Sequence, residues 1–195
     1  MSTGMCGQDI IKQLADEIVA EGASRARILT SSQVVIDPRV RLKCQVPSCD
    51  SYNFNLQCPP NCLSVNDFAN YLACYQQVIL VQLEAELTNA DTVEAHYDPT
   101  EVYKPANQLH QLINWAESRA FALGFRFACG FIGGCCRLCP VCVGPKGEKC
   151  RHPFKARPSM EAVGIDVFAT SQAAGIPIEF PVRDKVVWCG MLLVE

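Results

Sequence analysis

Four cysteines between Gly133 and Pro153 have a spacing that suits a metal centre. They form a C-x2-C-x2-C-x7-C pattern within the stretch GGCCRLCPVCVGPKGEKCRHP. Three thiolates so close in sequence can surround one compact group when a loop aims each sulfur inward, and a cubane cluster is such a group. The spacing predicts a [4Fe–4S] cluster bound by this second cysteine box, which comprises Cys136, Cys139, Cys142 and Cys150.

Several alternatives to this ligand set stay open at the level of sequence. The bacterial ferredoxin pattern begins in the same way, but its fourth cysteine follows after three residues, whereas Cys150 follows after seven that include a Gly-Pro-Lys-Gly turn. Structural zinc also takes four cysteines, usually as two separated C-x2-C pairs. The CPVC segment resembles a redox-active C-x-x-C pair. Cys135 could replace Cys136 as a ligand, and Cys129 could be a core residue or a further ligand.

Basic residues crowd around the second box. A reduced cubane with four thiolates carries about three negative charges, so nearby cations favour its reduction. The same cations could dock an acidic redox partner, and the alternative is a merely solvated loop. The residues are Arg137, Lys146, Lys149, Arg151, Lys155 and Arg157, against the single acid Glu148.

An earlier stretch, CQVPSCDSYNFNLQCPPNC, contains four more cysteines in a proline-rich loop: Cys44, Cys49, Cys58 and Cys62. This first cysteine box predicts a second metal site, with iron–sulfur favoured over zinc. Four protein ligands would close the site and suit electron transfer. Three would leave one iron open to a substrate or to an atom of a partner.

Three segments resemble a known family. RLKCQVPSCDSYNFNLQCPP, CRLCPVC and above all CRHPFKARPSMEAVGIDV are similar to the bacterial and archaeal family called domain of unknown function 2284, described as predicted metal-binding proteins. The resemblance spans about residues 35 to 194. It implies metal binding without an established reaction, and an open three-cysteine site in the first box. The ligands it implies are Cys44, Cys49 and Cys58 in the first box and Cys136, Cys139, Cys142 and Cys150 in the second.

Composition indicates a globular protein of a reducing compartment. The chain has 195 residues, 49% apolar and 19% charged, with a net charge of −3, so nothing favours nucleic-acid binding. The N-terminus lacks the features of a signal peptide and no segment is long and apolar enough to cross a membrane, which predicts a cytoplasmic location and no membrane contact. The thirteen cysteines are therefore expected to be thiols or metal ligands.

The pattern of elements predicts one α+β domain over residues 1–195 with a small mixed or antiparallel sheet packed with helices. Amphipathic or capped stretches predict helices, and apolar β-branched runs predict strands. Two cysteine-rich loops, about 44–62 and 129–157, would project from the sheet. Helices are expected at 8–20, 64–75, 106–123, 158–163 and 166–174, strands at 78–87, 125–131 and 185–194, and extended segments at 26–37 and, with alternating basic residues, 39–44.

The remaining candidate residues are assigned mainly structural roles. Arg157 or Glu161 is expected to hydrogen-bond carbonyls of the second loop, and His152 to lie near the cluster without binding it. Motifs for nucleotide binding are absent, and no Ser-His-Asp set can be recognised. His96 and His110 are predicted at the surface, Cys6, Cys74 and Cys189 as ordinary thiols, and Met160 and Met191 in the core.

The favoured function is an iron–sulfur protein with one or two [4Fe–4S] clusters that transfers single electrons to a redox partner protein. One alternative is an enzyme that uses an open iron of the first box on a small substrate. The other is a zinc-stabilised interaction module. The sequence contains no indication of oligomeric state.

Overall fold

Four antiparallel strands form one sheet in the order β1-β2-β4-β3. The computed structural model describes residues 7–86, 99–182 and 185–195. Strands β2 and β4 lie at the centre, and β2 is rich in β-branched and aliphatic residues because both of its faces are buried. The strands are β1 (Arg25–Thr30), β2 (Gln77–Glu86), β3 (Cys129–Phe131) and β4 (Lys185–Leu193). The expected α+β fold is confirmed, and of the two expected kinds of sheet, mixed or antiparallel, the structure has the antiparallel one.

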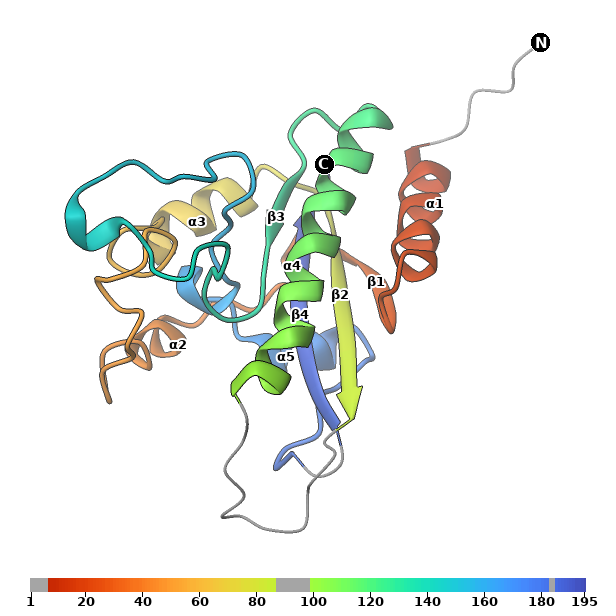
Figure 1. The fold of residues 1–195 in the computed structure, drawn as a ribbon. Helices are drawn as coiled ribbons and strands as arrows, with labels where there is room; N and C mark the ends of the chain where they lie inside the picture. The colour runs from red at the N-terminus through yellow and green to blue at the C-terminus, as the bar shows by residue number, and fades with distance from the viewer. Residues whose placement is uncertain (1–6, 87–98, 183–184) are drawn as a thin grey trace.

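Two helices, α1 (Gly7–Ala20) and α4 (Pro99–Ala122), cover one face of the sheet (Figure 1). Their apolar stripes meet alternate residues of β2 and β4, as the two-residue period of a strand requires. The cluster includes Leu14, Ile18, Ile79, Ile113 and Leu192, all fully buried. Gly130 and Gly190 let α4 approach closely, since a Cβ on either would meet the Ile113 side chain at 2.5 and 2.9 Å.

The opposite face carries a second core under short elements. Phe68 of α3 (Val65–Leu72) packs edge-on against Phe131 of β3, with ring centroids 5.1 Å apart. Met160 and Met191 are fully buried there, as predicted. Ser64 caps α3 by accepting a hydrogen bond from the Asp67 amide at 3.0 Å, which confirms the capping residue read from the sequence.

The helix predicted at residues 106–123 begins earlier in the structure than expected. We expected α4 to begin near residue 106, because the amphipathic stripe that predicts it starts at Leu109. The helix instead begins at Pro99 and continues through Pro105. Its predicted end is confirmed, since Gly124 follows with a φ of +103°, a conformation that glycine adopts readily.

The predicted extended segment at 39–44 was wrong. Residues Pro38–Leu42 form the short helix α2. Asp37 caps it by accepting from the Arg39 amide at 2.8 Å, and Pro38 occupies the first turn. This local capping outweighs the alternating pattern of basic and apolar residues that suggested a strand.

Two further elements are shorter than expected. The strand predicted at 125–131 is reduced to β3, because residues 125–128 turn after α4. The helix predicted to begin at Pro158 is a single 3-10 turn, η3 (Glu161–Val163), because the Pro158 carbonyl accepts from the Ile132 amide at 3.0 Å and Ser159 pairs with Ile132. The predicted helix at 166–174 is present as α5 (Val167–Ala173).

An ion pair joins the two helices of the first face. The Arg119 guanidinium donates to both carboxylate oxygens of Glu17 at 2.5 and 2.7 Å. Hydrogen bonds from Arg119 and Gln13 lower the pKa of Glu17 from 4.5 to about 2. The pair therefore links α1 to α4 whenever Glu17 is ionised.

This pair predicts a specific acid sensitivity. Because the folded-state pKa of Glu17 is depressed, its contribution to stability is present above its unfolded value and is lost as the pH falls from about 4.5 towards 2. We expect Glu17→Gln to make the urea midpoint less dependent on pH over this range than in the unaltered protein. Glu21→Gln serves as the control, and equal slopes for all three proteins would contradict the assignment.

No helix within the described ranges is both long enough and apolar enough to cross a membrane. The cytoplasmic location stays a prediction.

Candidate metal centre

The two cysteine loops lie side by side on the same flank of the sheet (Figure 1). Asn55 of the first loop is buried, and its side-chain amide donates to the Cys136 carbonyl at 2.8 Å. The Asn55 carbonyl accepts from the Cys58 amide at 3.0 Å. Cys58 of the first box and Cys136 of the second, far apart in sequence, are thus connected through one buried residue.

A cavity of about 300 Å³ lies between the loops. All four cysteines of the second box line it, together with Cys135. The opposite wall is formed by the first loop, from Ser51 to Gln57. The tertiary structure therefore brings Cys136, Cys139, Cys142 and Cys150 to the wall of one cavity, and their role as ligands stays a prediction.

Backbone amides point at two of these sulfur atoms. The His152 amide donates to the Cys150 sulfur at 3.4 Å. Burial raises the pKa of Cys136, a hydrogen bond from the Leu138 backbone lowers it, and the neighbouring thiols of Cys150, Cys139 and Cys142 raise it. His152 thus acts through its backbone, while its side chain is exposed.

The first box is centred on Cys58, which is 8% exposed. Burial raises its pKa most, and the thiols of Cys135, Cys62, Cys49 and Cys44 raise it further. A series of tight turns holds the box, including a hydrogen bond of 3.1 Å from the Cys49 amide to the Cys44 carbonyl. The four cysteines of the first box therefore lie near one another, with Cys135 of the second loop beside Cys58.

Cys62 has different surroundings from the cysteines of the second box. Its sulfur lies 3.7 Å from the carbonyl oxygens of both Leu63 and Ala162, in the geometry of an S–H donor. Burial raises its pKa, and the Arg41 guanidinium lowers it. Arg41 itself donates to the Leu63 carbonyl at 2.7 Å.

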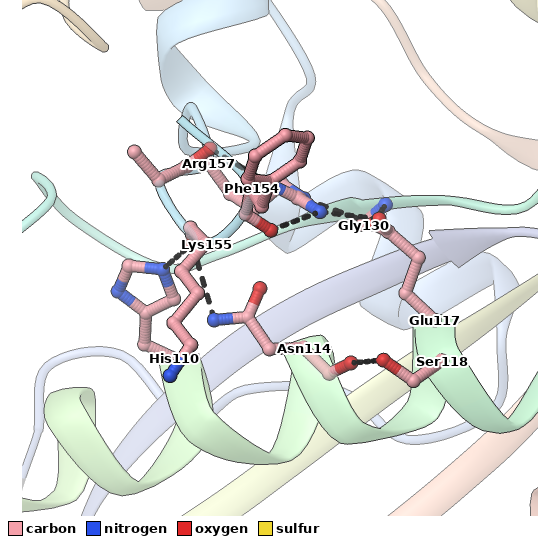
Figure 2. A network of polar contacts seen from close by, with 9 residues as sticks. His110, Asn114, Glu117, Ser118, Gly130, Phe154, Lys155 and Arg157 are labelled. Atoms are coloured by element: carbon pink, nitrogen blue, oxygen red, sulfur yellow. Dashed lines mark hydrogen bonds and ion pairs between the residues drawn. The ribbon is translucent and has the colours of Figure 1, made fainter. Parts of the chain in front are cut away.

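Three polar side chains of helix α4 (the α4 brace) hold the second loop by hydrogen bonds, and the sequence did not predict them. His110, Asn114 and Glu117 recur at i, i+4 and i+7, so they share one side of the helix (Figure 2). His110 Nε2 and the Asn114 side-chain amide both donate to the Lys155 carbonyl, at 2.8 and 3.1 Å. The helical spacing of these three polar residues, next to the apolar stripe of the same helix, is the signal in the sequence that could have indicated them.

The surface position predicted for His110 was wrong, since the residue is only 3% exposed. Burial lowers its pKa, so the ring is neutral near pH 7. A carbonyl can only accept a hydrogen bond, and the ring therefore carries its proton on Nε2. The residue is buried because the Lys155 segment covers it, a contact between positions that are distant in sequence.

Glu117 and Arg157 form the strongest link of the brace (Figure 2). The Arg157 guanidinium donates to both carboxylate oxygens, through Nε at 2.9 Å and through Nη2. Glu117 also accepts from the Gly130 amide at 2.6 Å, and Arg157 donates to the carbonyls of Ala156 and Phe154 at 2.9 and 3.2 Å. This confirms the carbonyl-bonding role expected of Arg157 and ties the loop to both α4 and β3.

The remaining cysteines lie apart from the two boxes. Cys129 lies in β3, where burial and Glu117 raise its pKa and Arg157 lowers it. Cys189 is buried in the core beside Ser171, and Cys74 is exposed after α3, as expected of ordinary thiols. Cys6 and His96 lie outside the described residues.

The basic residues divide into two groups. Lys146, Lys149, Arg151 and Lys155 are exposed on the second loop. Arg157 is engaged by Glu117, and Arg137 lies over the Tyr103 ring at 3.7 Å from its centroid. The exposed cations share the loop with two apolar side chains, since Phe154 and Val141 are 89% and 62% exposed.

The chemistry of the donors fits a metal that prefers thiolates. Such soft ligands suit iron–sulfur clusters and zinc. A bound cation also stabilises the thiolate form, which removes the penalty that burial and neighbouring thiols place on Cys58 and Cys136. Within residues 7–86, 99–182 and 185–195, no three Cys, His, Asp or Glu side chains converge at the distances that a single ion needs.

Comparison with known proteins identifies a family. A model of the family described as predicted metal-binding protein, domain of unknown function 2284, matches residues 27–194. No curated protein and no solved structure matches the chain. Because the match includes both cysteine boxes, the α4 brace and the motif from Arg157 to Asp166, the chain belongs to this family of predicted metal-binding proteins.

Proposed function

We propose that the chain is an iron–sulfur protein that transfers single electrons to a redox partner. The second box would hold one [4Fe–4S] cluster through Cys136, Cys139, Cys142 and Cys150, and the first box would hold a second cluster. A bound cluster supplies a centre that gains or loses one electron. The residues of the chain would hold this centre, exclude water from it and present it to a partner.

The observation that carries the proposal is the cavity between the loops. Its wall contains the four cysteines of the second box, and its volume of about 300 Å³ accommodates a group of several atoms. The four ligands of zinc would instead converge on one point about 2.3 Å from each sulfur. Thiols that surround a space support a cluster, in which each thiolate binds a different iron.

The amides that face sulfur atoms support the same conclusion. Hydrogen bonds to the sulfurs and solvent exposure tune the reduction potential of a cluster. The His152 amide at the Cys150 sulfur and the Leu138 amide at Cys136 are such donors. They stabilise negative charge on sulfur and would make the centre easier to reduce.

The exposed part of the second loop supplies a surface for a redox partner. Four cations and the exposed side chains of Phe154 and Val141 lie next to the ligands. Opposite charge on a partner would speed association, and apolar contacts at the centre of an interface would stabilise it. An acidic electron-transfer protein is the partner that this surface fits.

Metal analysis tests the proposal. The full chain, purified under anoxia, is expected to contain about eight irons and eight acid-labile sulfides, and to give an EPR signal of a reduced cubane after dithionite. About four irons would restrict the cluster to one box. Stoichiometric zinc without sulfide would overturn the proposal in favour of a zinc-stabilised interaction module.

A further inference from the structure

One side chain of the first loop reaches across to the second box. Asn55 is only 7% exposed and lines the cavity together with Cys136. Its Nδ2 donates to the Cys136 carbonyl at 2.8 Å, while its Oδ1 accepts from the Gln57 amide at 2.9 Å and closes a turn within the first loop. The side-chain amide of Asn55 therefore holds its own loop with one atom and a candidate metal ligand with the other.

The backbone around Asn55 is fixed as well. The Asn55 carbonyl accepts from the Cys58 amide at 3.0 Å and from the Asn61 side chain at 3.3 Å. Its own amide donates to the Ser51 carbonyl at 3.1 Å. Each polar atom of Asn55 thus has a described partner, and separation of the two loops would leave its buried Nδ2 without one, at a cost in free energy.

A second contact joins the same two loops. Gly144 follows the third cysteine of the second box, and a Cβ at this position would lie 2.4 Å from the Phe54 carbonyl oxygen and 3.4 Å from Cγ of Leu56. The two backbones can approach this closely because glycine has no side chain. Residues 54–56 therefore hold the second loop at two places, at its first cysteine and just after its third.

The segment that carries the first three cysteines of the second box has no backbone pairing of its own. Among the described residues, no backbone–backbone hydrogen bond involves positions 134–142. The Cys135 carbonyl accepts from Arg137 of the same segment at 3.1 Å, whereas the Cys136 carbonyl accepts from the other loop. The hydrogen bond from Asn55 is therefore a contact that fixes Cys136 relative to the rest of the cavity wall.

We propose that Asn55 is a positioning residue of the second metal site, of which the first loop forms a part. The hydrogen bond to the Cys136 carbonyl fixes the backbone that carries this sulfur, although the two residues are 81 positions apart. Partners that orient a metal ligand commonly contribute about 10- to 100-fold to metal affinity. The inference deepens the proposed function, on which it rests, because the first loop then determines how firmly the second loop holds its metal.

Asn55→Ser tests this contact without a change of charge. Serine is too short to reach the Cys136 carbonyl, and its hydroxyl still accepts a hydrogen bond from the backbone amide two residues on. We expect an excess of chelator, under anoxia, to remove the metal of the second site at least about tenfold faster from this variant than from the unaltered chain. The metal of the second site is identified as the metal that Cys136→Ser lacks.

Asn61→Ser is the matched control. Asn61 is exposed in the same loop, and among the described hydrogen bonds its side chain donates only to the Asn55 carbonyl. The same chemical change there removes a bond within the first loop and no contact with the second loop. The release rate of this variant is expected to match that of the unaltered chain. Equal acceleration in both variants would mean that general loosening of the first loop, and not the donor of Asn55, controls release.

Spectra separate a positioning role from a loss of stability. If the second site holds an iron cluster, the EPR signal that Cys136→Ser lacks is expected to change its g values in Asn55→Ser, because the Cys136 sulfur changes its orientation. A lower urea midpoint with unchanged EPR signals would contradict the positioning role and leave Asn55 as a structural residue only.

Gly144→Ala tests the same interface and leaves Asn55 in place. Its methyl group would meet the Phe54 carbonyl, so the loops must move apart, and faster release from the second site is again expected. Unaltered release rates in both Asn55→Ser and Gly144→Ala would overturn the inference. The metal content of the unaltered chain decides the proposed function separately, since the ratio of release rates is informative for iron and zinc alike.

Discussion

Cys136→Ser is expected to lose the second metal centre, which is about four of about eight irons per chain. Cys136 lies at the wall of the cavity, and its carbonyl is fixed by Asn55 at 2.8 Å, so its sulfur cannot be replaced by a distant thiol without movement of the loop. A serine hydroxyl is a much poorer ligand for iron than a thiolate. Iron and sulfide analysis under anoxia measures the loss.

Cys74→Ser is the matched control for this variant. Cys74 is an exposed thiol that contacts only the Asn70 carbonyl among the described hydrogen bonds, so its loss leaves the iron content unchanged. Cys135 is the neighbour that could substitute for Cys136. Full iron in Cys136→Ser, with loss only in the double variant, would show that the two adjacent cysteines are interchangeable and would contradict the assignment of Cys136 alone.

Arg157→Ala is expected to lower the free energy of unfolding by about 3 kcal/mol. The change leaves Glu117 as a partly buried carboxylate with only the Gly130 amide among its described partners, and it removes the hydrogen bonds to the carbonyls of Ala156 and Phe154. The side chains of Arg157 and Glu117 are only 15% and 20% exposed, so water compensates little for the lost partner. Urea unfolding of anoxic protein with equal metal content measures the effect.

The more exposed ion pair of the same helix provides the comparison. Arg119 and Glu17 are 36% and 28% exposed, and the loss of such a surface pair costs about 1 kcal/mol or less. We therefore expect Arg119→Ala to be clearly milder than Arg157→Ala. Equal effects of the two variants would mean that the Glu117–Arg157 pair does not anchor the second loop.

The sequence predicted those features that depend on neighbours in the chain. The apolar period of 3.6 placed α1 and the C-terminal part of α4, and the capping pair Ser64 and Asp67 located α3. The same local reasoning failed where two local signals competed. At Pro38–Leu42 the cap and proline outweighed the alternating pattern, and at Pro158 pairing with Ile132 replaced the first turn of a helix.

The sequence likewise predicted the part of the candidate site that depends on neighbours in the chain and missed the part that depends on packing. Spacing alone grouped the four cysteines of the second box, because residues within a short loop cannot be far apart. It did not reveal Cys135 beside Cys58, or the buried His110 under Lys155, since these pairs are far apart in sequence and meet only through packing. The Glu117–Arg157 pair, 40 residues apart, belongs to the same class.

The sequence by itself determined the chemical kind of the candidate ligands and their local grouping, because thiol chemistry and short loops need no tertiary context. Only the tertiary structure decided which residues surround these thiols. It placed the second box opposite residues 51–57 of the first loop and buried His110 under the Lys155 segment. Burial and the choice of hydrogen-bond partner are properties of the packed chain, because they depend on residues that are distant in sequence.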